Sequence, residues 1–199
     1  EETTRSTRAA LEKAGIAAVP FYKAVEFAKE LDSASCARLE AQLQKMGILD
    51  ALIVSQQDFE RIRQVCPQFL DTVLYIEEKG SSHFSGLAAS ETLGDGHREM
   101  VERILSNIYE KNGLRQGIFL GKDGSFRQGI LAGRADKAGA AEFVGLLARK
   151  KRKEEKIRQL QEKIQEYTEN AAAMNEEIDK LEMCLSTLQE EYQGLPGFS

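Results

Sequence analysis

Few residues in this sequence have the types and spacing that chemistry requires, and the first candidate is a lysine in a glycine-rich run. Residues Gly121–Ser125 (GKDGS) place Lys122 beside glycines, as phosphate-binding loops do. A phosphate loop has a longer fixed spacing before its Gly-Lys pair and leads from a strand into a helix N-terminus. Here the spacing is wrong, and Asp-Gly is a pair that tight hairpin turns prefer. We therefore interpret this run as a turn.

The two histidines are the next candidates, for metal binding or acid–base chemistry. His83 and His97 lie in or beside the Gly/Ser-rich stretch 79–96. Either chemistry would need a cluster of cysteines or carboxylates beside them, and none can be argued. Asp50 and Asp58 are isolated carboxylates, interpreted as a strand-edge or turn residue and a helix-start residue. We predict no catalytic residue, no metal and no cofactor, and expect that the chain alone is not an enzyme.

The cysteines and the apolar runs indicate the cellular compartment of the protein. Cys36, Cys66 and Cys184 are odd in number and have no CxxC spacing, which favours a reducing cytoplasm over a disulfide framework or a zinc site. No apolar run approaches the length of a membrane span, and no signal peptide opens the sequence. Because the first residue is not Met and the last lie just past a regular repeat, we expect a fragment of a longer protein.

A run of five cations is the strongest candidate for contact with nucleic acid. The net charge of −5 argues against a wholesale nucleic-acid binder, but the charge is unevenly distributed. Cations on a helix can touch phosphates without reading sequence. The alternative is a solvated helix that Glu154 and Glu155 partly neutralise. The predicted DNA-binding residues are Arg149, Lys150, Lys151, Arg152 and Lys153.

Four glycines flank the predicted hairpin and leave backbone uncovered by side chains. They permit either bulges and turns within the chain or the close approach of a second chain along an edge strand. In the second case, the edge strand pairs with its two-fold mate. The residues concerned are Gly117, Gly121, Gly129 and Gly133.

A long heptad seam dominates the C-terminal quarter of the chain. Apolar residues recur every three and four positions with no Pro or Gly between them, which is typical of a coiled coil. The alternative is an amphipathic helix folded back on its own domain. Eight basic and three acidic residues lie in 149–163, against one basic and eight acidic in 164–192. The seam consists of Ile157, Leu160, Ile164, Tyr167, Ala171, Met174, Ile178, Leu181, Leu185, Leu188 and Tyr192.

The remaining elements must position these residues. Periodicity, capping and turn signals predict an α+β (α/β) globule with a mixed sheet, flanked by a short N-terminal helical arm and a long C-terminal coiled-coil helix. The partner of the seam must come from outside this chain or from a second copy. The predicted domains are an arm stub (1–15), a globule (16–142), a coiled-coil arm (143–193) and a tail (194–199). The predicted helices are 1–14, 32–46, 57–64, 97–109 and 137–147 running on into the seam; the predicted strands are 21–27, 48–54, 69–76, 116–120 and 125–131, with a short element around Leu87 and Gly133 closing the hairpin.

Four sequence blocks resemble, in the same order, blocks of the SMC-like subunit of Wadjet anti-plasmid systems, the JetC type, which is related to MukB and MksB. The resemblance covers most of residues 20–152. The blocks are AVEF (Ala24–Phe27), RLEAQLQKMGILDALIV (Arg38–Val54), DGSFRQGILAG (Asp123–Gly133) and EFVGLLARKKR (Glu142–Arg152).

The resemblance implies an SMC-type hinge that pairs two subunits at the tips of their arms, as a homodimer, with glycines of the hairpin near the contact. It further implies weak, non-specific contact with double-stranded DNA, other complex subunits reached through the parent, and a cytoplasmic location on nucleoid or plasmid. The chain lacks the Walker A, signature and Walker B motifs, so ATP hydrolysis is assigned to no residue here. A coiled-coil adaptor whose globule binds a protein or small ligand is the alternative; the missing phosphate loop argues against a nucleotide-binding enzyme fragment.

Overall fold

The structure, a computed structural model, describes residues 2–76, 78–111, 117–136 and 139–194. The chain divides into two compact units, Glu1–Arg152 and Lys153–Ser199. The predicted boundary between globule and arm, at residues 142 and 143, lies inside the first unit. The predicted strand start at Gln116, the helix start at Lys137 and most of the tail lie outside the described residues.

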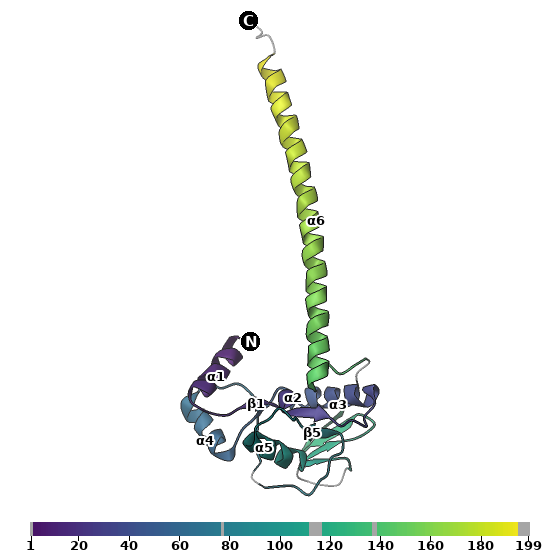
Figure 1. Ribbon diagram of the computed structural model, residues 1–199. Coiled ribbons are helices and arrows are strands. Elements are labelled where there is room, and N and C mark those ends of the chain that lie inside the picture. The colour runs from purple at the N-terminus through teal and green to yellow at the C-terminus, as the bar shows by residue number, and fades with distance from the viewer. Residues whose placement is uncertain (1, 77, 112–116, 137–138, 195–199) are drawn as a thin grey trace. The chain divides into compact units, whose positions relative to one another are not determined.

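Helices and short strands alternate in the first unit, which confirms the predicted α+β composition (Figure 1). The helices are α1 (Glu2–Lys13), α2 (Phe21–Ala24), α3 (Ser33–Lys45), α4 (Gln56–Val65), α5 (Asp95–Leu105) and α6 (Leu146–Gln193). The strands are β1 (Val19–Pro20), β2 (Val25–Phe27), β3 (Leu52–Ile53), β4 (Val73–Leu74), β5 (Leu87–Ala89), β6 (Ile108–Tyr109), β7 (Ile118–Leu120), β8 (Ser125–Gln128) and β9 (Leu131–Arg134).

The strands form three small sheets. In the first, β3 pairs antiparallel with β1 and parallel with β4. In the second, β2 pairs antiparallel with β5. The third has the order β6-β7-β8-β9, parallel between β6 and β7 and antiparallel beyond. Two of the three sheets are therefore mixed.

Two apolar cores hold the helices and sheets of the first unit together. The larger core joins α2, α3 and α5 to the β6–β9 sheet, with Leu43, Val101 and Ile108 fully buried. The smaller core joins α1 to β3 and α4. In it, Leu11 is 1% exposed and packs in one cluster with Ile62. The first helix is thus part of a core of the globular unit, and its interpretation as the end of an arm stays a prediction.

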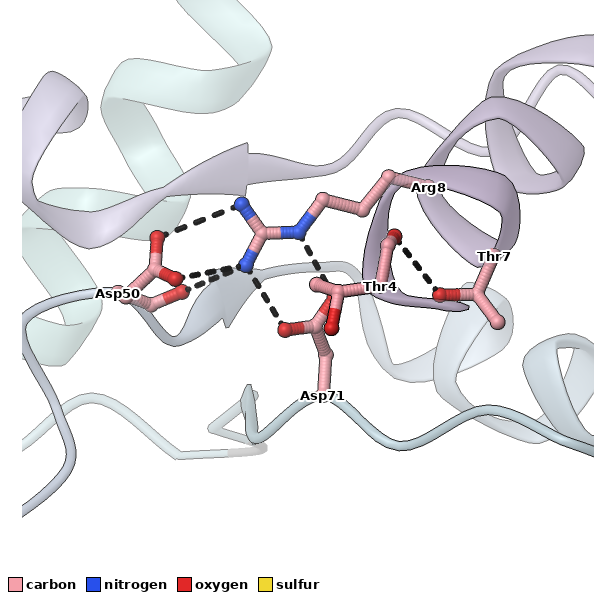
Figure 2. A network of polar contacts seen from close by, with 5 residues as sticks. All are labelled: Thr4, Thr7, Arg8, Asp50 and Asp71. Atoms are coloured by element: carbon pink, nitrogen blue, oxygen red, sulfur yellow. Dashed lines mark hydrogen bonds and ion pairs between the residues drawn. The ribbon is translucent and has the colours of Figure 1, made fainter. Parts of the chain in front are cut away.

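An arginine on α1 ties this helix to two loops, as Figure 2 shows. The Arg8 Nε donates to Asp71 Oδ2 at 2.7 Å, and Nη2 donates to Asp71 Oδ1 at 2.8 Å. The same Nη2 reaches Asp50 Oδ2 at 3.0 Å. The hydrogen bonds to Asp71 raise the pKa of the Arg8 guanidinium above its ordinary value. Asp50, expected at a strand edge or turn, therefore also binds α1.

The local signals for helix ends and turns are confirmed. The Asp32 carboxylate accepts from the Ser35 amide at 2.6 Å and caps α3. Gly47 ends the same helix with φ +73°, a conformation that L side chains disfavour. The turn between β7 and β8 contains Gly124 at φ +88°, as the Asp-Gly pair predicts.

Several predicted strands are wrong in extent. Residues 21–24 form one helical turn, because Phe21 and Ala24 face the core from the same side at a spacing of three. In segments 48–54 and 69–76, only β3 and β4 enter a ladder. Ile48, Leu49 and Val54 are buried in the two apolar cores although they lie outside the ladder, so the hydrophobic run overstates strand length.

Three predictions about the second half are corrected. The helix predicted for 97–109 ends at Leu105, and the chain continues into β6. Gly133 does not close the hairpin but lies inside an additional strand, β9, opposite Phe126. The long helix begins at Leu146, because Gly139 and Gly145 adopt positive φ, which a helix that includes these residues does not allow.

Removal of the Arg8 contacts should destabilise the first unit more than loss of an exposed ion pair does. Arg8→Ala leaves Asp71, whose side chain is 10% exposed, without its charged donor, and we expect a loss of about 1–3 kcal/mol in the free energy of unfolding. The control is Arg103→Ala, which breaks an exposed pair with Glu99 and should cost below about 0.5 kcal/mol. Urea unfolding measures both, and equal effects would contradict the assigned role of Arg8.

Candidate functional site

The segment that precedes α6 is held by a buried carboxylate of α3. Glu40 is 0% exposed, and its oxygens accept from three consecutive backbone amides. The Glu142 amide donates to Oε1 at 2.8 Å, the Phe143 amide to Oε2 at 2.8 Å and the Val144 amide to Oε2 at 3.0 Å. A buried charge is tolerated only when it is paired or hydrogen-bonded in this way. Glu40 therefore fixes the backbone that leads into the long helix.

Two cations of the predicted DNA-binding run continue this attachment. Arg149 Nη1 donates to the Tyr22 carbonyl at 2.8 Å and to the Phe143 carbonyl at 3.2 Å. Arg152 Nε donates to Glu142 Oε2 at 3.1 Å, and its guanidinium lies 4.4 Å from the Phe143 ring centroid. Residues three apart share one face of a helix, so both arginines meet the same segment. Their side chains thus bind the segment before α6, although that of Arg152 is 53% exposed.

The other three cations of the run have different surroundings. Lys150, Lys151 and Lys153 are exposed, and Lys150 takes part in a further contact within the chain. The sequence treats the five cations as equivalent, but in the structure the two arginines bind the segment before α6, while Lys151 and Lys153 are exposed. Lys151 and Lys153 are consequently the residues of the run best placed to meet a phosphate backbone.

The glycines of the hairpin meet the chain's own atoms at three of the four positions. A Cβ on Gly117 would lie 2.6 Å from the Asn107 carbonyl oxygen, and one on Gly133 would lie 2.7 Å from Cζ of Phe126. A Cβ on Gly121 would collide with Ser125 Oγ. These contacts favour the interpretation as bulges and turns. Gly129 has open space around it and positive φ in the β8–β9 turn.

The same hairpin ends in an exposed apolar edge. Every residue of β9 is exposed, and β9 is the last strand of its sheet among the described residues. Ile130 is 106% exposed and Leu131 is 49% exposed, so two large apolar side chains stand at the tip. An exposed edge strand offers unpaired amides and carbonyls to another strand. This edge, residues 130–134, is the part of the hairpin best suited to bind a second chain.

The seam of α6 is exposed along its whole length. The described residues of α6 include none that is buried, and Ile157, Ile164 and Leu181 are 44%, 63% and 65% exposed. A stripe of this length in contact with water is the surface of α6 that we expect to bind a partner. The structure contains no partner chain, so the coiled coil itself stays a prediction.

The two histidines have different surroundings in the structure. Among them, no group of three or more His, Cys, Asp or Glu side chains could hold a metal ion. His97 lies on α5, and its buried Nε2 has no hydrogen-bond partner among the described residues. His83 is in the loop that precedes β5 and is not brought into a cluster with it.

The sequence analysis did not identify two polar residues of α3 that hold other segments in place. Gln42 is 2% exposed, and its Nε2 donates to the carbonyls of Gly121 and Ser125 at 2.9 and 2.7 Å, which holds the hairpin turn on α3. Glu40 is the other. Both lie on the face that carries Leu39 and Leu43. Polar residues within an apolar helix face could therefore have predicted buried hydrogen bonds from the sequence.

Loss of the Glu40 charge should loosen the segment before α6. Glu40→Gln removes the charge and retains one acceptor oxygen, and in either orientation of the amide its NH2 donor faces the donor amides of the segment 142–144. We expect a destabilisation of about 2–3 kcal/mol and faster hydrogen exchange at residues 142–144. The control Glu102→Gln, at an exposed site on α5, should change neither. Unchanged exchange in Glu40→Gln would contradict the role given to the carboxylate.

Comparison with known proteins adds no family to this description. No protein-family model matches the chain, and no curated protein or solved structure matches it. No helix among the described residues is long and apolar enough to cross a membrane. The function must therefore be argued from the site itself.

Proposed function

We propose that this chain is the hinge module of an SMC-like complex of the Wadjet, JetC type. In this proposal, the globular unit Glu1–Arg152 pairs with a second copy, and α6 begins an arm that leads to the rest of a longer protein. The observation that carries the proposal is the exposed apolar edge strand at residues 130–134, at the end of a sequence block that resembles such hinges.

The firm attachment of the edge supports this role. Gln42 holds the β7–β8 turn, and Lys45 Nζ donates to the Arg134 carbonyl at 3.0 Å, so α3 binds both ends of the hairpin. A strand that is already ordered loses little conformational entropy when it pairs with another chain. Pairing of β9 with its two-fold mate would extend the sheet and bury the apolar tip.

The second candidate function is a coiled-coil adaptor whose globule binds a protein or small ligand. The exposed seam of α6 favours it, because an adaptor needs a helical contact but no dimer of the globule. The two candidates therefore differ in the state of the first unit when the seam is absent. The first unit contains both apolar cores, so it should fold without the seam.

The oligomeric state of residues 1–152 tests the hinge. We expect this fragment to sediment as a dimer at micromolar concentration, and Ile130→Glu with Leu131→Glu to make it monomeric, since a charge at the tip would be buried unpaired. The control Leu70→Glu changes another exposed leucine, 74% exposed, and should leave the dimer intact. A monomeric wild-type fragment would refute the hinge and favour the adaptor.

DNA contact is the secondary role that we propose. Lys151→Glu with Lys153→Glu should weaken binding of a long duplex at low salt. It should also make the slope of log binding constant against log salt concentration shallower by about two, because each lost phosphate contact removes about one unit. Lys13→Glu with Lys29→Glu makes the same charge change at other exposed lysines and should have a smaller effect. Equal affinity for duplex in all three proteins would remove the DNA role from these residues.

A further inference from the structure

The β6–β9 sheet has one face in the larger core and one face outside it. Successive residues of a strand point to opposite faces of a sheet. Ile118 and Leu120 of β7 are buried in the larger core, so Phe119 between them lies on the other face. Its partners in the ladders with β6 and β8 lie on that face too. This outer face carries Tyr109, Phe119, Ser125, Arg127, Ala132 and Arg134.

Two aromatic rings of the outer face belong to neither apolar core. Tyr109 and Phe119 are partners in the β6–β7 ladder, where neighbouring strands lie about 4.8 Å apart. Both residues are half-buried. Neither one is among the described residues that form the two cores or pack against them. Core packing therefore does not account for this pair of rings.

Glycines make room for both rings. A Cβ on Gly117 would lie 2.7 Å from Cε2 of Tyr109, and one on Gly121 would lie 3.1 Å from Cζ of Phe119. Each ring therefore occupies the space above a glycine, which a larger residue would fill. The other uncharged residues of the outer face are serine and alanine, so the strands supply no further bulky apolar side chain to cover the rings.

The charged residues of the outer face are two exposed arginines. Arg127 Nε donates to the Gly129 carbonyl at 3.1 Å, and Arg134 Nε donates to the Asp123 carbonyl at 2.9 Å. Each bond holds a guanidinium close to the sheet and uses one of its five N–H donors. The strands place no carboxylate on this face, although the net charge of the chain is −5. The outer face is therefore complementary to an anion.

Two carboxylates at the end of the outer face already have partners. Asp123 Oδ1 accepts from the Ser125 amide at 3.1 Å, and this contact lowers the pKa of Asp123. Asp136 Oδ1 lies 3.6 Å from Arg38 Nε. Lys122, whose side chain is 89% exposed, adds a cation in the turn between β7 and β8. These carboxylates do not cancel the positive charge of the arginines.

Aromatic rings beside arginines are the groups that bind single-stranded nucleic acid. Unpaired bases stack on aromatic rings, and rings on adjacent strands of a sheet can take successive bases. Arginine binds phosphate through its planar fork of donors. A duplex hides the faces of its bases, so it could use the arginines but not the rings. The combination on the outer face thus favours a single strand over a duplex.

We infer that the outer face binds single-stranded nucleic acid, with bases stacked on Tyr109 and Phe119 and phosphates bound by Arg127 and Arg134. The inference does not rest on the proposed hinge, which uses the backbone edge and apolar tip of β9. It is also separate from the proposed duplex contact, which uses Lys151 and Lys153.

Fluorescence anisotropy of a labelled oligothymidylate of about 15 nucleotides tests the site with the full chain. All proteins carry Lys151→Glu and Lys153→Glu, so the proposed duplex contact is absent whether or not that proposal holds. Phe119→Leu and Tyr109→Leu each keep an apolar side chain but remove a ring, and each should raise the Kd roughly tenfold. Tyr192→Leu removes an exposed ring from α6 and should leave the Kd unchanged.

Salt dependence tests the phosphate contact. Arg127→Gln should make the slope of log binding constant against log salt concentration shallower by about 0.7, the value for one phosphate contact on a single strand. Arg63→Gln, at an exposed arginine of α4, is the matched control and should leave the slope unchanged. Oligouridylate of the same length shows whether the strand is DNA or RNA, and a raised Kd in Phe119→Leu for either one supports the inference.

A tryptophan at position 119 detects stacking directly, because the sequence contains no other tryptophan. Phe119→Trp should retain the affinity, since indole offers a large aromatic face, and a stacked base should quench its fluorescence. An oligomer of abasic nucleotides has the same phosphates and should not quench it. Three results would overturn the inference: an unchanged Kd in both leucine variants, equal affinity for a hairpin duplex with the same number of phosphates, or no quenching by oligothymidylate.

Discussion

The buried carboxylate of Glu40 is the constraint on which the first unit depends. It lies on the apolar face of α3, where an unpartnered charge would be prohibitively costly, and the amides of residues 142–144 stabilise it. The requirement is mutual, because those amides precede the first turn of α6 and have no helical partner of their own. The Glu40 side chain thus provides acceptors for the amides of residues 142–144, and these amides in turn satisfy its buried charge, although the two segments are far apart in sequence.

The same helix organises the hairpin. Gln42 is bonded to the β7–β8 turn, Arg38 Nη1 donates to the Lys122 carbonyl at 2.7 Å, and Lys45 donates to the Arg134 carbonyl. Polar residues on three successive turns of α3 therefore hold one sheet, while the leucines between them enter the core. Because these donors bind backbone carbonyls, they fix the path of the chain whatever side chains the hairpin carries. The side chain of Ile130 at the apolar tip is therefore not needed for this attachment.

The sequence predicted best those features that depend on a few neighbouring residues. The Asp32 cap, the Gly47 helix end and the Asp-Gly turn follow from local backbone preferences, and the structure contains all three. The predicted strand lengths were wrong because a ladder of two residues, as in β3 and β4, is too short to show the alternation of apolar and polar residues that identifies a strand. The start of α6 was predicted too early for a related reason: Gly139 and Gly145 have positive φ, and Glu40, far away in sequence, binds the amides of residues 142–144. The roles of the hairpin glycines depend equally on distant atoms, such as the Asn107 carbonyl.

The period of α6 explains why one basic run has several roles. Arg149 and Arg152 share the face that meets Tyr22 and Phe143, where their guanidinium groups satisfy carbonyls and cover aromatic rings. Counted back from Ile157, Lys153 falls on the seam, and a cation there weakens the pairing of helices. The first turns of α6 are therefore bound strongly to the globular unit and are poorly suited to bind another helix. The apolar seam begins at Ile157, so the contacts of Arg149 and Arg152 and the predicted pairing of the seam use different residues of α6.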